Sequence, residues 1–200
     1  YYSNTAATTL SVTNLSNNTN YCFVVYAKDS ANNTSSGSNQ VCESTIDNGT
    51  GGGYELFFSE YIEGSSYNKG LEIANFTGSA VNLAEYSIFK QANGAGSWGS
   101  ELSLFGTIAN GDVYVIVNTE ANAEMQAVTD LTTGSQSVNF NGNDPVALFK
   151  NGTLIDVIGT FNSTSNYSKD KTLVRSATVS APNLTYTVSE WEVFTKDTST

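Results

Sequence analysis

The stretch PVALFKNGTLIDVI at residues 145–158 places two short apolar segments on either side of Asn151-Gly152. Asn-Gly between two such segments is the strongest short-range signal for a β-hairpin. Residues 145–150 and 153–158 are therefore predicted to form two antiparallel strands. The stretch indicates a fold built from strands.

Further strand-like segments precede this hairpin at residues 54–62, 69–76, 81–83, 86–90 and 112–118. The apolar run within residues 112–118 predicts a central strand that is buried on both faces. Residues 119–128 form the one helix expected, with Thr119 as its N-cap and acidic residues in its first turn. Short strands at this spacing predict an all-β chain with an antiparallel β-sandwich.

Two cysteines, Cys22 and Cys42, lie in a separate pair of strand-like segments near the start of the chain. Residues 21–27 alternate in polarity, residues 38–45 form the second segment, and the turn-rich residues 29–37 lie between them. A hairpin centred near Asn32 places the two cysteines opposite each other, where a disulfide is geometrically allowed. The alternative is a pair of buried, reduced thiols. A disulfide implies an oxidising compartment.

The Gly-rich residues 46–53 are the clearest linker signal in the chain. We therefore expect a first domain at residues 1–46, a linker at 47–53 and a second domain at 54–200. Because the chain begins with Tyr1 rather than Met, it is expected to be a fragment of a longer, processed protein.

Composition excludes several classes of enzyme. The chain has no histidine, so it cannot contain a Ser-His-Asp triad, a Cys-His pair or a histidine-ligated metal centre of its own. The net charge of −11 and the scattered basic residues disfavour binding to nucleic acid. No apolar run approaches the length of a membrane-spanning helix, so membrane insertion is not expected.

Leu15, Thr19 and Tyr21 form a spaced pattern that is similar to the tyrosine corner of fibronectin type III domains, with Asn17 where that family usually has proline. On this pattern, residues 8–46 resemble the last three strands of such a domain. Half a sandwich cannot bury both faces of its core. This segment is expected to be completed by upstream residues, to dock on the second domain, or to be only partly ordered.

Eight segments of the second domain together form a recognisable pattern: residues 59–66, 68–69, 71–75, 111–116, 141–148, 155–159, 170–175 and 189–193. On these segments, residues 54–195 resemble a bacterial lamin tail domain. Ala74 departs from the family's more usual aromatic residue. The resemblance implies an immunoglobulin-like β-sandwich without catalytic residues, found in secreted or surface proteins and often attached to extracellular endonucleases or phosphatases.

Four acidic residues lie in or near these segments and are candidates for a calcium site: Glu60, Glu63, Asp144 and Asp156. Calcium takes six to eight oxygen ligands, usually from several acids close together in the sequence. No D-x-D-x-D-G loop is present, and the alternative is that these acids are solvated or cap turns. No other cofactor is expected.

Trp98 and Tyr67 lie in predicted loops and are candidate binding residues, because exposed aromatic rings can stack on sugars or anchor a partner protein. The alternative for Trp98 is that it plugs one end of the sandwich. Trp191 lies in a strand-like segment and is expected in the core.

We therefore expect a non-catalytic accessory module of a secreted or bacterial cell-surface protein, which acts as a spacer, presents a neighbour or binds a protein. The parent is expected to be an extracellular nuclease. The expected partners are other domains of the parent and a protein of a surface or secretion complex. Two alternatives are a carbohydrate-binding or adhesion module that targets a polysaccharide, and a DNA-holding module for an attached nuclease.

Overall fold

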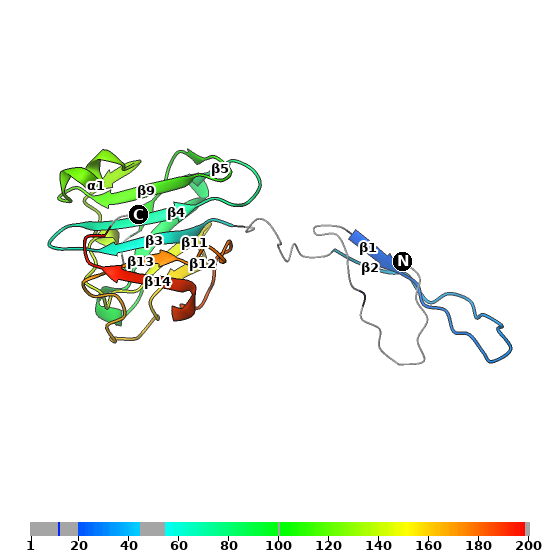
Figure 1. Ribbon diagram of the computed structural model, residues 1–200. Helices are drawn as coiled ribbons and strands as arrows, with labels where there is room; N and C mark the ends of the chain where they lie inside the picture. Colours follow the sequence, from blue (N-terminus) through cyan, green and yellow to red (C-terminus); the bar gives the residue numbers. More distant parts are fainter. Residues whose placement is uncertain (1–11, 13–19, 45–54, 100, 199–200) are drawn as a thin grey trace. The chain divides into compact units, whose positions relative to one another are not determined.

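The computed structural model describes residues 12, 20–44, 55–99 and 101–198 (Figure 1). The chain divides into two compact units, Tyr1–Thr50 and Gly51–Thr200. The predicted linker, and Leu15, Asn17 and Thr19 of the predicted tyrosine corner, lie outside the described residues. The domain bounds inferred from the sequence therefore stay a prediction. Among the described residues, no helix is long and apolar enough to cross a membrane.

The first unit contains an antiparallel hairpin of β1 (Asn20–Phe23) and β2 (Val41–Ser44). Cys22 lies directly opposite Cys42, and the two form a disulfide, which confirms the predicted pair. Both strands are shorter than predicted. Beyond β1, the hydroxyl groups of Ser38 and Ser35 accept the amide hydrogens of Val25 and Ala27, so side chains replace part of the expected backbone ladder.

The second unit has one sheet of six strands in the order β10-β9-β4-β3-β13-β14. Neighbours are antiparallel, except that β10 runs parallel to β9. The strands are β3 (Phe57–Glu63), β4 (Lys69–Ala74), β9 (Val113–Asn118), β10 (Leu131–Thr133), β13 (Lys171–Arg175) and β14 (Trp191–Thr195).

A second sheet of four strands has the order β12-β11-β6-β7 and lies behind the first in Figure 1. Asn151 and Gly152 have φ angles of 48° and 76°, as a two-residue hairpin turn requires, so the predicted hairpin is confirmed. The strands are β6 (Tyr86–Lys90), β7 (Leu102–Ser103), β11 (Val146–Lys150) and β12 (Thr153–Ile158). A small sheet pairs β5 (Val81–Asn82) with β8 (Thr107–Ile108).

The core lies between the two sheets because alternate residues of each strand face inward. Tyr61 of β3 stacks on Phe140 with ring centroids 4.3 Å apart. Trp191 is buried as predicted. The unit is thus an immunoglobulin-like β-sandwich, the predicted fold. Its larger core residues include Leu71, Ile73, Ile88, Ile116, Leu148 and Leu173.

The predicted helix is shorter than expected and begins later. It is α1 (Ala123–Ala127), and Asn122, not Thr119, is its N-cap and accepts the Met125 amide hydrogen at 3.0 Å. Asn118 explains the difference, because its side chain accepts the Glu120 amide hydrogen and turns the chain before a helix can start. The described residues also form four short 3-10 helices, at Leu83–Glu85, Ala92–Gly94, Gln136–Val138 and Val188–Glu190.

Candidate functional site

Asp156, one of the four calcium candidates, is fully buried in an ion pair with Arg175 of β13, at 3.3 Å. Its two oxygens also accept the amide hydrogens of Phe58 and Asn183, each at 2.8 Å. These bonds join β12 to β3 and β13, and hence one sheet to the other. Burial raises the pKa of Asp156 to about 6, against the opposing effect of the Arg175 charge.

Arg175 is also buried and makes a second ion pair with Glu190 at 2.8 Å. Its guanidinium lies over the Trp191 ring, 4.7 Å from the centroid. We call Asp156, Arg175 and Glu190 the inter-sheet clamp. The ion pairs and hydrogen bonds of the clamp account for the positions of these three side chains, so a metal ion is not needed to explain them.

Of the other three candidates, Glu60 of β3 is buried opposite Glu72, and Glu63 and Asp144 have structural partners. Glu63 pairs with buried Lys69 at 2.6 Å and accepts the Asp170 amide hydrogen. Asp144 accepts the amide hydrogens of Asn93 and Asn141 and lies 3.8 Å from the Lys90 ammonium. In the described part of the chain, no three acidic or cysteine side chains are grouped to hold a metal ion. Calcium binding stays a prediction that these contacts do not favour.

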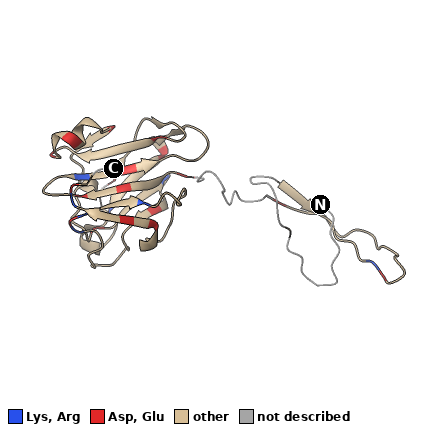
Figure 2. Ribbon diagram, viewed as in Figure 1, with Lys and Arg blue, Asp and Glu red and all other residues tan. Residues whose placement is uncertain are grey.

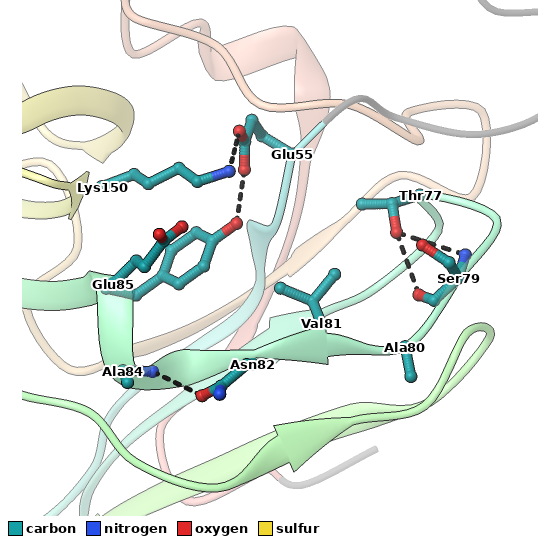
Figure 3. A pocket seen from close by; sticks show the side chains of 10 residues that line it. Glu55, Thr77, Ser79, Ala80, Val81, Asn82, Ala84, Glu85 and Lys150 are labelled. Carbon is teal, nitrogen blue, oxygen red and sulfur yellow. Dashed lines mark hydrogen bonds and ion pairs between the residues drawn. The ribbon is translucent and has the colours of Figure 1, made fainter.

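A polar hollow of about 520 Å³ opens beside Glu55, Tyr86 and Lys150 (Figure 3). Glu55 accepts hydrogen bonds from the Tyr86 hydroxyl at 2.5 Å and from the Lys150 ammonium at 2.6 Å. Burial, and then the bond to Glu55, raise the pKa of Tyr86 to about 12, and the Glu55 bond also raises the pKa of Lys150. Both groups therefore stay protonated near neutral pH, so neither is a general base.

Trp98 and Tyr67 come from different loops and have different surroundings. Trp98 is half-buried and packs on Phe161 and Phe149, with centroids 4.8 and 5.8 Å away. Phe149 alternates with the core residue Leu148, so Trp98 covers the outer face of the four-stranded sheet and does not plug an end of the sandwich. Tyr67 lies exposed in the β3–β4 turn. Whether either ring binds a ligand stays a prediction.

A groove of about 440 Å³ lies on the outer face of the six-stranded sheet. We call it the sheet-face groove. Ile62, Gly70 and Val117 are aligned across β3, β4 and β9 and form part of its floor. Glu60, Glu72 and Val115 form the next row across the same strands.

The walls of the groove come from segments outside the sheet. Met125 and Val128 of the α1 region form one wall, and Asp197 and Thr198 line another part. Asn68 links these walls, because its side chain accepts the Asn122 amide hydrogen at 2.9 Å and donates to Asp197 at 3.0 Å.

Carboxylates dominate the polar lining of the groove, and none of its described lining residues is Lys or Arg. Acidic positions, red in Figure 2, recur on the strands of this sheet. The bond from Asn68 lowers the pKa of Asp197, so this group stays charged at neutral pH. The carboxylates are Glu60, Glu72, Glu124 and Asp197. The groove can therefore attract a cation that also has apolar surface.

Sequence reasoning found one residue of the groove, Glu60, and assigned it to calcium. Strand alternation could have shown that Glu72 and Val115 face the same way as Glu60 once the strands were aligned. The contribution of α1 and of Asp197 had no local sequence signal, since they come from segments far apart in the chain.

Two family profiles match the chain. One, described as Lamin Tail Domain, matches residues 50–162, and the other, described as Interferon-alpha/beta receptor, fibronectin type III, matches residues 2–46. No curated protein matches the sequence. The first match ends before β13 and β14, although these strands belong to the six-stranded sheet.

Proposed function

The chain belongs to the lamin tail domain family, and from that premise we propose that it is a protein-binding accessory module of a secreted or cell-surface multidomain protein. The lamin tail domain and the fibronectin type III domain are both immunoglobulin-like, non-catalytic modules. The proposed role is to space and present the other domains of the parent, an extracellular nuclease in our proposal, and to hold a partner protein of the surface.

The sheet-face groove carries the binding part of this proposal. Its volume of about 440 Å³ falls in the range of sites that hold a small ligand or a few side chains of a partner. It combines apolar walls with a small number of charged groups, as binding sites commonly do.

The chemistry of the other polar groups supports a role without catalysis. The polar hollow holds Tyr86 and Lys150 in their protonated forms, and Asp156 is buried and bonded on both oxygens. A general acid–base pair instead needs groups that can exchange protons near the working pH and can reach a substrate.

The disulfide between Cys22 and Cys42 supports an extracellular location, because such bonds persist in oxidising compartments. The acidic lining of the groove also favours a protein partner over nucleic acid, whose phosphates it would repel.

The test compares ligand classes on the whole chain. Immobilised protein is exposed to a peptide array, a glycan array and duplex DNA at physiological salt, and is assayed with nucleic acid, phosphate ester and glycan substrates. Binding to peptides without turnover supports the proposal. Turnover that is lost on changing one carboxylate overturns it.

Two binding outcomes also overturn it in favour of an alternative. Glycan binding alone, lost in Trp98→Ala, would indicate a carbohydrate-binding module. Tight DNA binding alone would indicate the DNA-holding module.

A further inference from the structure

We infer that the sheet-face groove binds an extended peptide segment in which one Lys or Arg is flanked by apolar residues. The inference deepens the proposed protein-binding function and rests on it. It names the chemistry that the partner must present to the groove.

Apolar residues of the lining supply surface for the partner, and exposed Val128 offers the most open part of it. Ile62 and Val117 pack with Met125 in a buried apolar cluster over Gly70. The methyl group of Met125 lies over this position, since a Cβ on Gly70 would come within 2.9 Å of it. Met125 is flexible and can adapt its shape to an apolar ligand.

The charges determine the sign of the partner. Glu72 of β4 is half-buried in the lining, and its carboxylate accepts a hydrogen bond from the Ser59 hydroxyl at 2.6 Å. Glu124 and Asp197 add negative charge elsewhere in the lining, which makes the groove complementary to a basic group.

Long basic side chains fit this combination better than a bare metal ion. Lys and Arg lay an apolar stem along a surface and keep their charged end on polar groups. The lining offers half-buried Val115 to the stem, next to half-buried Glu72 for the charge. Arg can also make two parallel bonds to one carboxylate.

The walls give the groove a fixed width before a partner arrives. Asn68 bonds to the start of α1 at Asn122 and to Asp197 of the opposite segment. Asp197 also accepts the Ser65 amide hydrogen at 2.8 Å. Preformed walls lower the entropy lost on binding, and they favour a narrow, extended segment over a broad folded surface.

The test uses the whole chain and a fluorescent seven-residue peptide with a central arginine between valine and leucine residues. A second peptide replaces the arginine with glutamine. We expect the arginine peptide to bind at least about tenfold more tightly, as loss of a charged contact predicts. Equal affinity for the two peptides would overturn the inference.

Matched variants place the binding in the groove. Glu72→Gln with Glu124→Gln should weaken binding of the arginine peptide about tenfold. Glu120→Gln with Glu192→Gln removes the same charge from exposed positions outside the lining and should change affinity less than about twofold. Thermal unfolding of each variant checks that it is folded.

Two outcomes would separate this inference from the proposed function. Equal weakening by both variant pairs would mean diffuse attraction to an acidic surface, and it would overturn the groove assignment alone. Peptide-array binding by sequences without Lys or Arg, together with no binding of the arginine peptide, would overturn the inference and leave the protein-binding function standing.

Discussion

The hairpin of the first unit and the sandwich of the second are stabilised in different ways. No described residue between 20 and 43 is classed as buried, and Val25, Tyr26 and Val41 are largely exposed. The sandwich instead buries a continuous apolar cluster and the inter-sheet clamp. A covalent bond therefore holds the hairpin's strands together, whereas burial of apolar side chains holds the sandwich's sheets together.

The exposed apolar surfaces of the two units also differ. The hairpin presents apolar side chains beside the disulfide, and the sandwich presents apolar side chains framed by carboxylates. On the sandwich, this surface lies in a hollow whose carboxylates favour a basic partner. We therefore assign binding to the sandwich.

The largest effect on stability is expected at the inter-sheet clamp. Arg175→Gln leaves Asp156 buried without its cation and should lower the free energy of unfolding of the sandwich by about 3–5 kcal/mol. Urea unfolding followed by Trp fluorescence measures this, since both tryptophans, Trp98 and Trp191, lie in the second unit.

Lys196→Gln is the control for this variant. It removes an exposed partner of Asp170, at 3.5 Å, and should cost less than about 1 kcal/mol. Equal effects of the two changes would contradict the stabilising role of the clamp.

The next largest effect should be confined to the hairpin. Cys22→Ser with Cys42→Ser opens a cross-link with a sequence separation of 20 residues, worth about 3 kcal/mol in the chain-entropy account. Amide hydrogen exchange at Phe23 and Val41 should accelerate, while the urea midpoint of the sandwich stays unchanged. A shift of that midpoint would show that the two regions are not independent.

The clamp also predicts a pH dependence. Because burial raises the pKa of Asp156 from 3.8 to about 6, the folded protein holds this proton more tightly than the unfolded chain. The contribution of Asp156 to stability is present below pH 4 and is lost as the pH rises through 6. The advantage of the wild type over Asp156→Asn should therefore shrink by about 2 kcal/mol across this window.

Urea unfolding of both proteins at intervals from pH 4 to 7 measures this difference, in which the other acids cancel. An advantage that grows with pH would contradict the account. It would mean that Arg175 outweighs burial and lowers the pKa of Asp156.

The smallest stability effect concerns the two loop aromatics. Trp98→Ala removes a half-buried ring from Phe149 and Phe161 and should cost about 1–2 kcal/mol. Tyr67→Ala, at an exposed turn position, should cost less than about 0.5 kcal/mol. A urea midpoint that moves equally in both variants would contradict the packing described for Trp98.

The sequence predicted those features of the fold that depend on short-range signals. Asn151-Gly152 indicated the β11–β12 hairpin, and the positions of Cys22 and Cys42 around Asn32 indicated the disulfide. The helix was placed too early because Asn118 bonds the following turn, and a periodicity pattern does not show that competing bond.

The candidate site was harder to predict because its partners are far apart in the sequence. The sequence predicted Asp156 as a calcium candidate, but its carboxylate bonds to Arg175, 19 residues later, and to Phe58, 98 residues earlier. The sheet-face groove likewise depends on strand register and on α1, which covers Gly70 with Met125. Residue types alone carry none of this information.

The most direct test of the account is an NMR titration of the whole, isotopically labelled chain with the arginine peptide. We expect shifts at the amides of Gly70, Val117 and Val128 of the groove, while Val25 of the hairpin and the Trp98 indole stay unchanged. Shifts confined to Val25 or to the Trp98 indole, with the groove amides unchanged, would contradict it.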